Sequence, residues 1–433
     1  MPSRRLSSRT RALARAQIAG AVLVAAVLAM VAATAAPAGA DPYMAPHGKV
    51  FVGVTGGRTV DGYAQAAGKH PAVFQFFVPW GDRFGYAYQR AGQAGARLMV
   101  HVSTYNGPGT QERTTPRDIA LGRGDAYLLS LNRDFAAYRE PVYLRLFSEM
   151  NNNENPYSAF DRSGAGRGPA HDTAWFRQAW RRAYLIVKGG RVATIDARLR
   201  RLGMPRLQHV PRRAGVRSHA RVRRLPRPEV AVQWAPMTAG SPDIPTNRPA
   251  AYWPGAAYVD WVGTDFYSRF PNFRGLNRFY ADRRYAGKPF VFGEWAMWGR
   301  DDPAFMRRFF SWVAGHRRVR MIVYNQGNRT NGPFRLYRYP RAAGVMRRAL
   351  RSSLYAQQPA PTRHRRFKRR ARRPLHFAVR TAAVPAELMT ALSGLTAALR
   401  LLTDYATPIH PAGADGPPPA PVPTRRDLSR MRA

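Results

Sequence analysis

Short apolar runs alternate with longer amphipathic segments along the middle of this 433-residue chain. Between about Gly48 and Tyr355, eight runs rich in Val, Ile, Phe and Tyr have the length of β-strands. They are Val50–Val54, Val73–Pro79, Arg97–Ser103, Val142–Phe147, Val230–Ala235, Val259–Thr264, Phe290–Gly293 and Met321–Tyr324. Several are nearly continuous in hydrophobic residues, which is typical of parallel strands that are covered on both faces.

Helical patterns separate most of these runs. They span Thr59–Lys69, Arg83–Gly95, Thr115–Tyr138, Thr173–Ala197, Phe273–Ala286, Pro303–His316 and Tyr337–Leu354. An alternating series with eight strands predicts an α/β protein with the fold of a TIM (β/α)8 barrel over residues 48–355. A doubly wound open sheet is the alternative, but Val54-Thr55-Gly56-Gly57 lacks the glycine spacing of a dinucleotide-binding loop.

Positive charge is concentrated near both ends of the chain and in one segment between two predicted strands. Lys and Arg number 69 against 25 Asp and Glu, a net charge of +44. Three tracts without an acidic residue, 1–17, 198–228 and 363–373, supply 24 of these charges. We predict that 198–228 is an Arg-rich insert on the N-terminal face of the barrel, away from the catalytic loops. Residues 356–433 are expected to form a basic, Pro-rich and mostly disordered extension, with one amphipathic helix at 384–405.

The basic tracts admit more than one partner. An anionic cell-wall polymer or lipid headgroups fit the charge, and a composition without specific function is the plain alternative. Neutralisation of nucleic-acid phosphates is a third interpretation, but no recognition motif accompanies the charge, so no specific nucleic acid is expected. The pattern leaves the oligomeric state open.

The N-terminal segment has the pattern of an export signal. Basic residues 1–17 precede the apolar run Ile18–Ala36, and Ala38-Gly39-Ala40 offers a small-residue cleavage site. Residues 1–40 are therefore predicted to be a secretory signal peptide, which would make the protein secreted or cell-wall associated. A retained membrane anchor is the alternative, because the run is long enough to span a bilayer. The chain has no cysteine, so no disulfide supports the exported fold.

Two carboxylates lie at the C-terminal ends of predicted strands, where the catalytic residues of TIM barrels are found. Glu149 follows the fourth predicted strand and Glu294 follows the seventh. Two carboxyls facing across a cleft are the equipment of a glycosidase, in which one protonates the leaving oxygen and the other attacks carbon or activates water. The alternative for either residue is a structural ion pair with one of the many arginines.

Aromatic side chains lie at the same level of the predicted barrel, where their rings would stack on sugars or pack in the core. They are Trp80, Tyr105, Trp234, Tyr267, Trp295, Trp298 and Tyr324. His101, at the end of the third strand, is a further candidate for substrate binding, although a lone histidine is often structural. No His, Asp and Glu cluster has metal-ligand spacing, so no metal or cofactor is expected.

The segments around these carboxylates resemble glycoside hydrolase family 26, a β-mannanase-like family in the clan of retaining barrels. The similar segments are Glu149-Met150-Asn151-Asn152-Asn153, Trp234-Ala235-Pro236, Tyr258 through Tyr267, and Lys288 through Glu294. The likeness covers about residues 48–350. It implies a secreted endo-β-mannanase-like enzyme that hydrolyses β-1,4-linked polysaccharide without a cofactor.

The resemblance also implies roles for single residues. Glu149 would be the acid/base and Glu294 the nucleophile. The Tyr267 hydroxyl would hold the nucleophile, Trp234 would form part of the wall around the reacting sugar, and Asn151 would supply a hydrogen bond to a substrate hydroxyl or to the acid. The other candidates for substrate binding rest on their positions at strand ends rather than on the resemblance, and they are Trp80, His101, Trp295 and Tyr324. Ser148 departs from the family, which usually has histidine before the acid/base. A non-catalytic polysaccharide- or cell-wall-binding barrel is therefore the alternative function.

Overall fold

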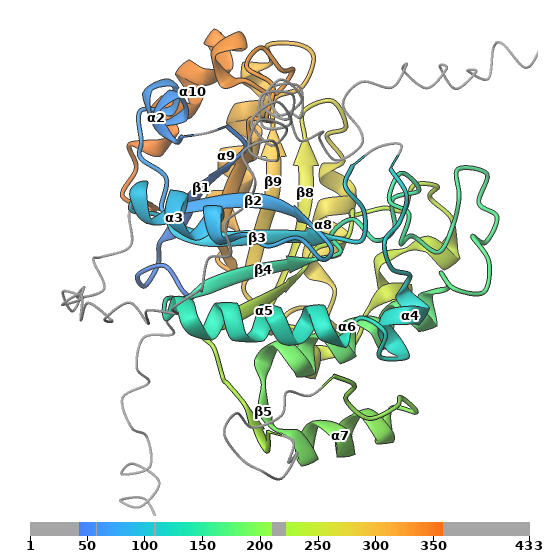
Figure 1. Ribbon diagram of the computed structural model, residues 1–433. Helices are drawn as coiled ribbons and strands as arrows, with labels where there is room; N and C mark the ends of the chain where they lie inside the picture. Colours follow the sequence, from blue (N-terminus) through green and yellow to red (C-terminus); the bar gives the residue numbers. More distant parts are fainter. Residues whose placement is uncertain (1–42, 58, 108–109, 210–221, 358–433) are drawn as a thin grey trace, which may run out of the picture. The chain divides into compact units, whose positions relative to one another are not determined.

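The computed structural model describes residues 43–357, apart from 58, 108–109 and 210–221. Eight parallel strands form a closed ring with the helices outside (Figure 1). They are β1 (Val50–Thr55), β2 (Val73–Pro79), β3 (Arg97–Ser103), β4 (Val142–Leu146), β7 (Val230–Trp234), β8 (Trp261–Tyr267), β9 (Phe290–Ala296) and β10 (Val319–Asn325). The ring closes between β1 and β10, from Phe51 opposite Met321 to Thr55 opposite Asn325. The predicted TIM barrel is confirmed.

The eight predicted strands all form, with small shifts at their ends. The sixth begins at Trp261, two residues later than expected, and the seventh continues through Ala296. A short strand, β11 (Tyr355–Ala356), pairs with the start of β1. Every residue of β1, β4, β7 and β9 is buried, as expected for parallel strands with a packed interior and an outer layer of helices.

The helices follow the predicted order. They are α2 (Asp61–Ala67), α3 (Gly85–Gln93), α4 (Pro116–Ala120), α5 (Asp125–Tyr138), α6 (Thr173–Lys188), α7 (Val192–Arg201), α8 (Phe273–Ala281), α9 (Pro303–Gly315) and α10 (Pro340–Leu350). Between β7 and β8 the chain makes the short 3-10 turns η1 (Pro245–Asn247), η2 (Pro249–Tyr252) and η3 (Ala256–Tyr258), and η4 (Leu336–Arg338) precedes α10.

Two predicted helices are each divided by glycine. The segment Thr115–Tyr138 contains α4 and α5, with Gly122 between them at φ +91°. The segment Thr173–Ala197 covers α6 and the first part of α7, which are separated at Gly189, where φ is +66°. A Cβ on Gly189 would lie 1.7 Å from the Pro226 carbonyl oxygen. The close approach of another backbone requires glycine here, which the hydrophobic period alone does not reveal.

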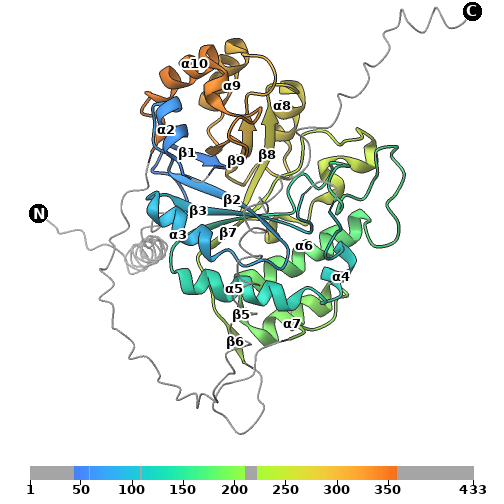
Figure 2. The ribbon, with the colours of Figure 1, turned by 45° about the horizontal axis from the view of Figure 1, so that its top comes forward.

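The described parts of the Arg-rich tract, residues 198–209 and 222–228, lie between α6 and β7. Its borders are held by β5 (Gly190–Arg191) and β6 (Arg224–Leu225), which pair antiparallel. Figure 2 shows α7, β5 and β6 at the periphery, beyond α5 and α6. The tract is not wholly a loop, because residues 198–201 form the last turn of α7. The predicted signal peptide, the helix at 384–405 and the C-terminal extension beyond residue 357 lie outside the described residues, as do 210–221.

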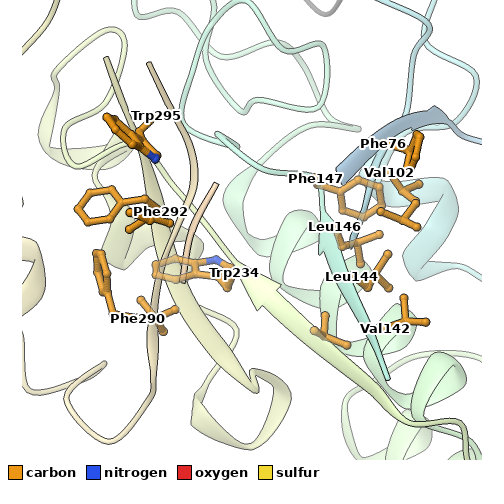
Figure 3. Close-up of a cluster of buried hydrophobic side chains, with 14 of the residues drawn as sticks. Phe76, Val102, Val142, Leu144, Leu146, Phe147, Trp234, Phe290, Phe292 and Trp295 are labelled. Carbon is orange, nitrogen blue, oxygen red and sulfur yellow. The ribbon is translucent and has the colours of Figure 1, made fainter. Parts of the chain in front are cut away.

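The core occupies the space between the strands and the helices. Figure 3 shows part of it, with Trp234, Phe292 and Trp295 in one group and Leu144 and Phe147 in another. All of these side chains are at most 1% exposed. The part of the chain that the structure describes has no helix with both the length and the hydropathy to cross a bilayer.

Candidate active site

An irregularity in β9 positions Glu294. Thr264 of β8 is opposite Phe292, but the next residue, Asp265, is opposite Glu294, so Gly293 has no partner in this register. A β-bulge of this kind redirects the side chains that follow it. A Cβ on Gly293 would lie 2.4 Å from Nε of Arg145, so glycine leaves room for that side chain.

The Glu294 carboxylate is held by donors from three other strands. Arg145 Nη1 of β4 donates to Oε1 at 2.7 Å. The Tyr267 hydroxyl of β8 donates to Oε2 at 2.8 Å, and Asn325 Nδ2 of β10 donates to Oε2 at 2.9 Å. The side chain is 11% exposed. Glu294 therefore has a fixed orientation and retains a narrow opening to solvent.

Arg145 is a fully buried cation that joins two carboxylates. Its Nη2 donates to both oxygens of Asp265, at 2.8 and 2.7 Å, while Nη1 also donates to Gln75 Oε1 at 3.2 Å. Burial alone would lower the pKa of the guanidinium, but the charges of Asp265 and Glu294 together raise it, so Arg145 stays charged. Asp265 Oδ1 also accepts from the backbone N–H of Glu294 at 2.9 Å. The bidentate pair thus fixes both the side chain and the backbone of Glu294.

Glu149 lies in a tight turn after β4. Its φ is +51° and that of Phe147 is +48°, a left-handed conformation that costs a non-glycine residue about 1–3 kcal/mol. The turn is tied down by the Glu149 N–H, which donates to the Ala235 carbonyl at 2.7 Å, and by Asn155 Nδ2, which donates to the Glu149 carbonyl at 2.9 Å. Tyr157 donates to the Ser148 carbonyl at 2.6 Å. Strain of this kind is maintained where the surroundings determine the conformation.

The Glu149 carboxyl is in a different electrostatic setting from Glu294. Burial, and then the negative charge of Glu294, raise its pKa to about 7, against a hydrogen bond from Asn152 Nδ2 to Oε2 at 2.9 Å. The structure therefore brings the two glutamates within electrostatic reach of each other. A carboxyl with this pKa is about half protonated at neutral pH, so it can act there as a proton donor.

Two further groups near the carboxylates are uncharged. Burial and the charge of Glu294 raise the pKa of Tyr267 well above its usual value, so its hydroxyl remains a donor. Burial and the charge of Arg145 lower the pKa of His101 well below its usual range, so its imidazole is neutral. His101 Nε2 lies 2.7 Å from Ser148 Oγ. The serine that departs from the family pattern is thus connected to a histidine from the neighbouring strand.

Four of the aromatic residues expected to contact sugar are core side chains. Trp295 is fully buried and stacks on Phe309 of α9 at 4.1 Å between ring centroids. Trp234 and Tyr324 are also fully buried, and Trp80 is 6% exposed. A ring without an accessible face cannot stack on a substrate, which corrects the expectation for these four. Tyr105 is buried as well, whereas Tyr267 and Trp298 are partly exposed.

The bulge in β9 and the direction of the last side chain of β7 explain the corrections for Trp295 and Trp234. Because Gly293 has no partner, Phe292 and Trp295 both contact α9, and Glu294 contacts residues of the barrel interior. Trp234 packs on Trp253 at 4.8 Å and on Phe279 of α8 at 6.1 Å between ring centroids, so its ring lies on the helix side of β7. A residue's level in a strand is thus predicted by sequence position, whereas the side it faces depends on the pleat and on the bulge.

Asn151 is structural. It is fully buried, its Nδ2 donates to the carbonyls of Met237 and Ala239, and its Oδ1 accepts from the Met237 N–H at 2.9 Å. These bonds fasten the turn after β4 to the loop after β7, and full burial keeps the amide out of reach of substrate. This placement corrects the expectation of substrate binding by Asn151.

The sequence analysis missed Arg145, Asp265 and Asn325. Arg145 is the single charged residue in the run Val-Tyr-Leu-Arg-Leu, which is a signal of a buried ion pair. Asp265 and Asn325 lie near the C-terminal ends of β8 and β10, and a polar residue at that level of a barrel strand is the signal that indicates them. In the described part of the chain, no group of three or more His, Cys, Asp or Glu side chains is arranged to hold a metal ion.

The arrangement is chemically asymmetric. One carboxyl has a raised pKa and a single side-chain hydrogen bond, and the other is fixed by a guanidinium, a phenol and an amide. A proton donor and an oriented carboxylate on different strands of one barrel are the groups that acid-assisted displacement at a sugar carbon requires.

Comparison with known proteins gives likenesses in structure only. No protein-family profile matches the chain, and no curated protein is significantly similar in sequence. Among solved structures, the chain is similar to the Bacillus subtilis mannanase BCman, with 12% identity, coverage of 74% of this chain and 90% of that one, and a TM-score of 0.46. It is also similar to a GH26 β-mannanase from Bacteroides ovatus, with 13% identity, coverage of 72% and 91%, and a TM-score of 0.45. Other similar structures include the Bacillus subtilis mannanase man26, with 13% identity, coverage of 72% and 88%, and a TM-score of 0.46.

Proposed function

We propose that this protein is a retaining glycoside hydrolase that cleaves β-1,4-linked polysaccharide of the mannan type. The observation that carries the proposal is the pair of carboxyls, Glu149 and Glu294, which interact electrostatically across the ends of β4 and β9 yet have different surroundings. Pairs of carboxyls whose environments separate their protonation states are typical of glycosidase acid and nucleophile pairs.

In the proposed first step, Glu149 donates its proton to the glycosidic oxygen while a Glu294 oxygen attacks the anomeric carbon. The C–O bond to the leaving sugar breaks, and a glycosyl ester of Glu294 forms. Arg145, Tyr267 and Asn325 hold the attacking carboxylate in place, which reduces the reorganisation needed in the transition state.

In the second step, Glu149 is ionised and removes a proton from water, which attacks the same carbon and releases Glu294. Two inversions give net retention of configuration. For this mechanism we expect the two carboxyl groups to stand roughly 5–5.5 Å apart, the separation typical of retaining enzymes.

A reducing-sugar assay tests the proposal. The wild type should release reducing ends from mannan, and parallel reactions with glucomannan and xylan measure its preference. Glu294→Ala should abolish the release. Glu229→Gln is the matched control, because Glu229 is exposed and precedes β7, at the opposite end of the barrel. Absence of product from all three polysaccharides with folded wild-type protein would contradict the proposal.

A second candidate function is a polysaccharide-binding barrel without turnover. The ion pair between Glu294 and Arg145, with a glutamate side chain that is only 11% exposed, favours it. So does Ser148, which has no imidazole of its own. One experiment distinguishes the two functions. A binding barrel is retained on a column of insoluble mannan but releases no reducing ends from it.

Export is part of the proposal. It is supported by the basic, apolar and small-residue pattern of residues 1–40, and the basic tracts suit a protein held near an anionic cell wall. Determination of the N-terminus of the mature protein tests this directly. A mature chain that begins near Asp41 agrees with export, and an intact Met1 in the membrane fraction would indicate an anchor.

A further inference from the structure

A small pocket lies beside the candidate active site, between the segments that follow β8 and β9. Its volume is about 230 Å³, and it is lined by Ser268, Arg269, Trp298, Gly299, Arg300 and Asp302. The wall is held by backbone bonds: Ser268 Oγ accepts from the Trp298 N–H at 2.8 Å, and the Ser268 N–H donates to the Ala296 carbonyl at 3.0 Å. The volume is below the roughly 300–1,000 Å³ of sites for drug-sized ligands, which suits one unit of a longer chain.

Arg269 supplies a positive charge at the rim. Its guanidinium carbon lies 5.0 Å from the Trp298 ring centroid and 5.9 Å from that of Phe270. Within the described residues it forms no ion pair with a carboxylate, and its side chain is exposed. Because the aromatic rings already restrict the guanidinium, less conformational entropy is lost when it binds an anion.

The single carboxylate in the pocket has other partners. Asp302 caps α9, where its Oδ1 accepts from the N–H groups of Ala304 and Phe305 at 3.0 and 2.9 Å. Its Oδ2 lies 3.7 Å from Nη2 of Arg300. The negative charge of Asp302 is thus offset by the N-terminus of α9 and by Arg300. Arg269 therefore makes the pocket attractive to an anionic ligand.

The pocket adjoins the groups assigned to the reaction. The Trp298 ring packs edge-on against Tyr267, with centroids 5.8 Å apart, and Tyr267 donates to Glu294. Ser268 and Arg269 follow Tyr267 directly in the chain. A polysaccharide with one sugar at Glu294 would therefore bring a neighbouring sugar or its substituent to this pocket.

We propose that this pocket is a subsite for a sugar unit that carries an anionic group, so that the preferred polysaccharide is acidic rather than neutral. Arg269 would bind the anion, and Trp298 would contact the apolar face of the sugar. The inference rests on the proposed function, whose polymer it specifies. A guanidinium accepts carboxylate and phosphate alike, and the shared chemistry is an exposed oxyanion on a sugar.

Binding to an inactive full-length protein tests the subsite without turnover. Glu294→Gln is titrated calorimetrically with mannohexaose, and with mannohexaose whose primary alcohols have been oxidised to carboxylates. We expect the oxidised form to bind about tenfold more tightly at low salt, with the difference decreasing as salt is raised. Inorganic phosphate is then added as a competitor, and displacement of the oxidised form would show that phosphate chemistry is also accepted.

The control separates this site from the general positive charge of the protein. Arg269→Gln in the same background should remove the preference, and Arg269→Lys should retain part of it. Arg308→Gln is the matched control, since Arg308 is an exposed arginine over an aromatic ring, Phe273, outside the pocket. Thermal unfolding verifies that each variant is folded.

Equal affinity for the two oligosaccharides, or equal loss of preference in Arg308→Gln and Arg269→Gln, would overturn the subsite. Because the readout is binding, its outcome is independent of hydrolysis. Wild-type protein that hydrolyses neutral mannan without an Arg269-dependent preference retains the proposed function and loses the subsite. Arg269-dependent binding without hydrolysis would support the subsite and contradict the proposed function.

Discussion

The surroundings of Glu294 and Glu149 differ in how many groups hold each carboxyl. Glu294 accepts hydrogen bonds from Arg145, Tyr267 and Asn325, which come from three separate strands. Glu149 accepts one side-chain bond, from Asn152 three residues further along the same turn. The first carboxyl is fixed by the barrel as a whole, and the second is fixed mainly through its backbone.

This difference shows how one barrel prepares two similar residues for opposite tasks. Donors that converge on Glu294 fix the orientation of its carboxylate, which a nucleophile needs. Burial and the nearby charge of Glu294, opposed by the bond from Asn152 and the charge of Arg145, raise the pKa of Glu149 to about 7, which an acid needs. If the comparison is correct, changes in the two regions should have different kinetic signatures.

The largest expected effect is that of Glu294→Ala. Removal of the nucleophile should lower kcat on mannan by roughly 10⁴-fold. Added azide should restore turnover of an activated aryl mannoside, because the small anion replaces the missing carboxylate and gives a glycosyl azide of inverted configuration. A product of retained configuration would reverse the roles assigned to the two glutamates.

Glu149→Gln should have a smaller effect, and one that depends on the leaving group. Loss of the acid should lower the rate on mannan by about 10²–10⁴-fold, because departure of a sugar oxygen needs a proton. On a dinitrophenyl mannoside, which departs without protonation, formation of the glycosyl-enzyme should be nearly unchanged. An equal decrease with both leaving groups would show that Glu149 is not the acid.

The pH dependence sharpens the comparison further. Since the acid must be protonated and its pKa is raised to about 7, kcat/KM for mannan should fall as the pH rises through 7. The expected decrease is about tenfold per pH unit, or roughly 100-fold at pH 9. The profile for the dinitrophenyl substrate should lack this alkaline limb. A mannan profile that stays flat to pH 9 would contradict the assignment.

Tyr267→Phe should have the smallest effect of the four. It removes one of three donors to Glu294 and leaves Arg145 and Asn325, so we expect kcat to fall about tenfold with KM little changed. Tyr337→Phe is the matched control, because Tyr337 is 57% exposed and its hydroxyl bonds only to Thr330 and Asn331. A loss as large as that of Glu294→Ala would mean that Tyr267 does more than hold the carboxylate.

The barrel and its two glutamates were predictable from sequence for a physical reason. Parallel strands buried on both faces are nearly continuous hydrophobic runs, and a polar residue at the end of such a run is conspicuous. Glu149 and Glu294 stand out in this way. The division of two helices was not predicted, since it depends on positive φ at Gly122 and on the approach of Pro226 to Gly189.

The direction of side chains was the part that sequence did not reveal. Phe292 and Trp295 are three residues apart and would face opposite sides of a regular strand, yet the bulge at Gly293 lets both pack on Phe309 of α9. Arg145 was overlooked because its partners, Asp265 and Glu294, are more than 100 residues away in the chain. Such pairings are set by the register of the barrel, which local patterns do not contain.

Covalent trapping tests the central claim most directly. The wild-type protein is incubated with 2-deoxy-2-fluoro-β-mannosyl fluoride, which forms the glycosyl-enzyme readily but releases it slowly, and the labelled peptide is sequenced by mass spectrometry. The account predicts a single fluorosugar ester on Glu294, and none in Glu294→Gln. A label on another carboxylate, such as Asp265 or Glu149, would contradict it, as would an active enzyme that takes up no label.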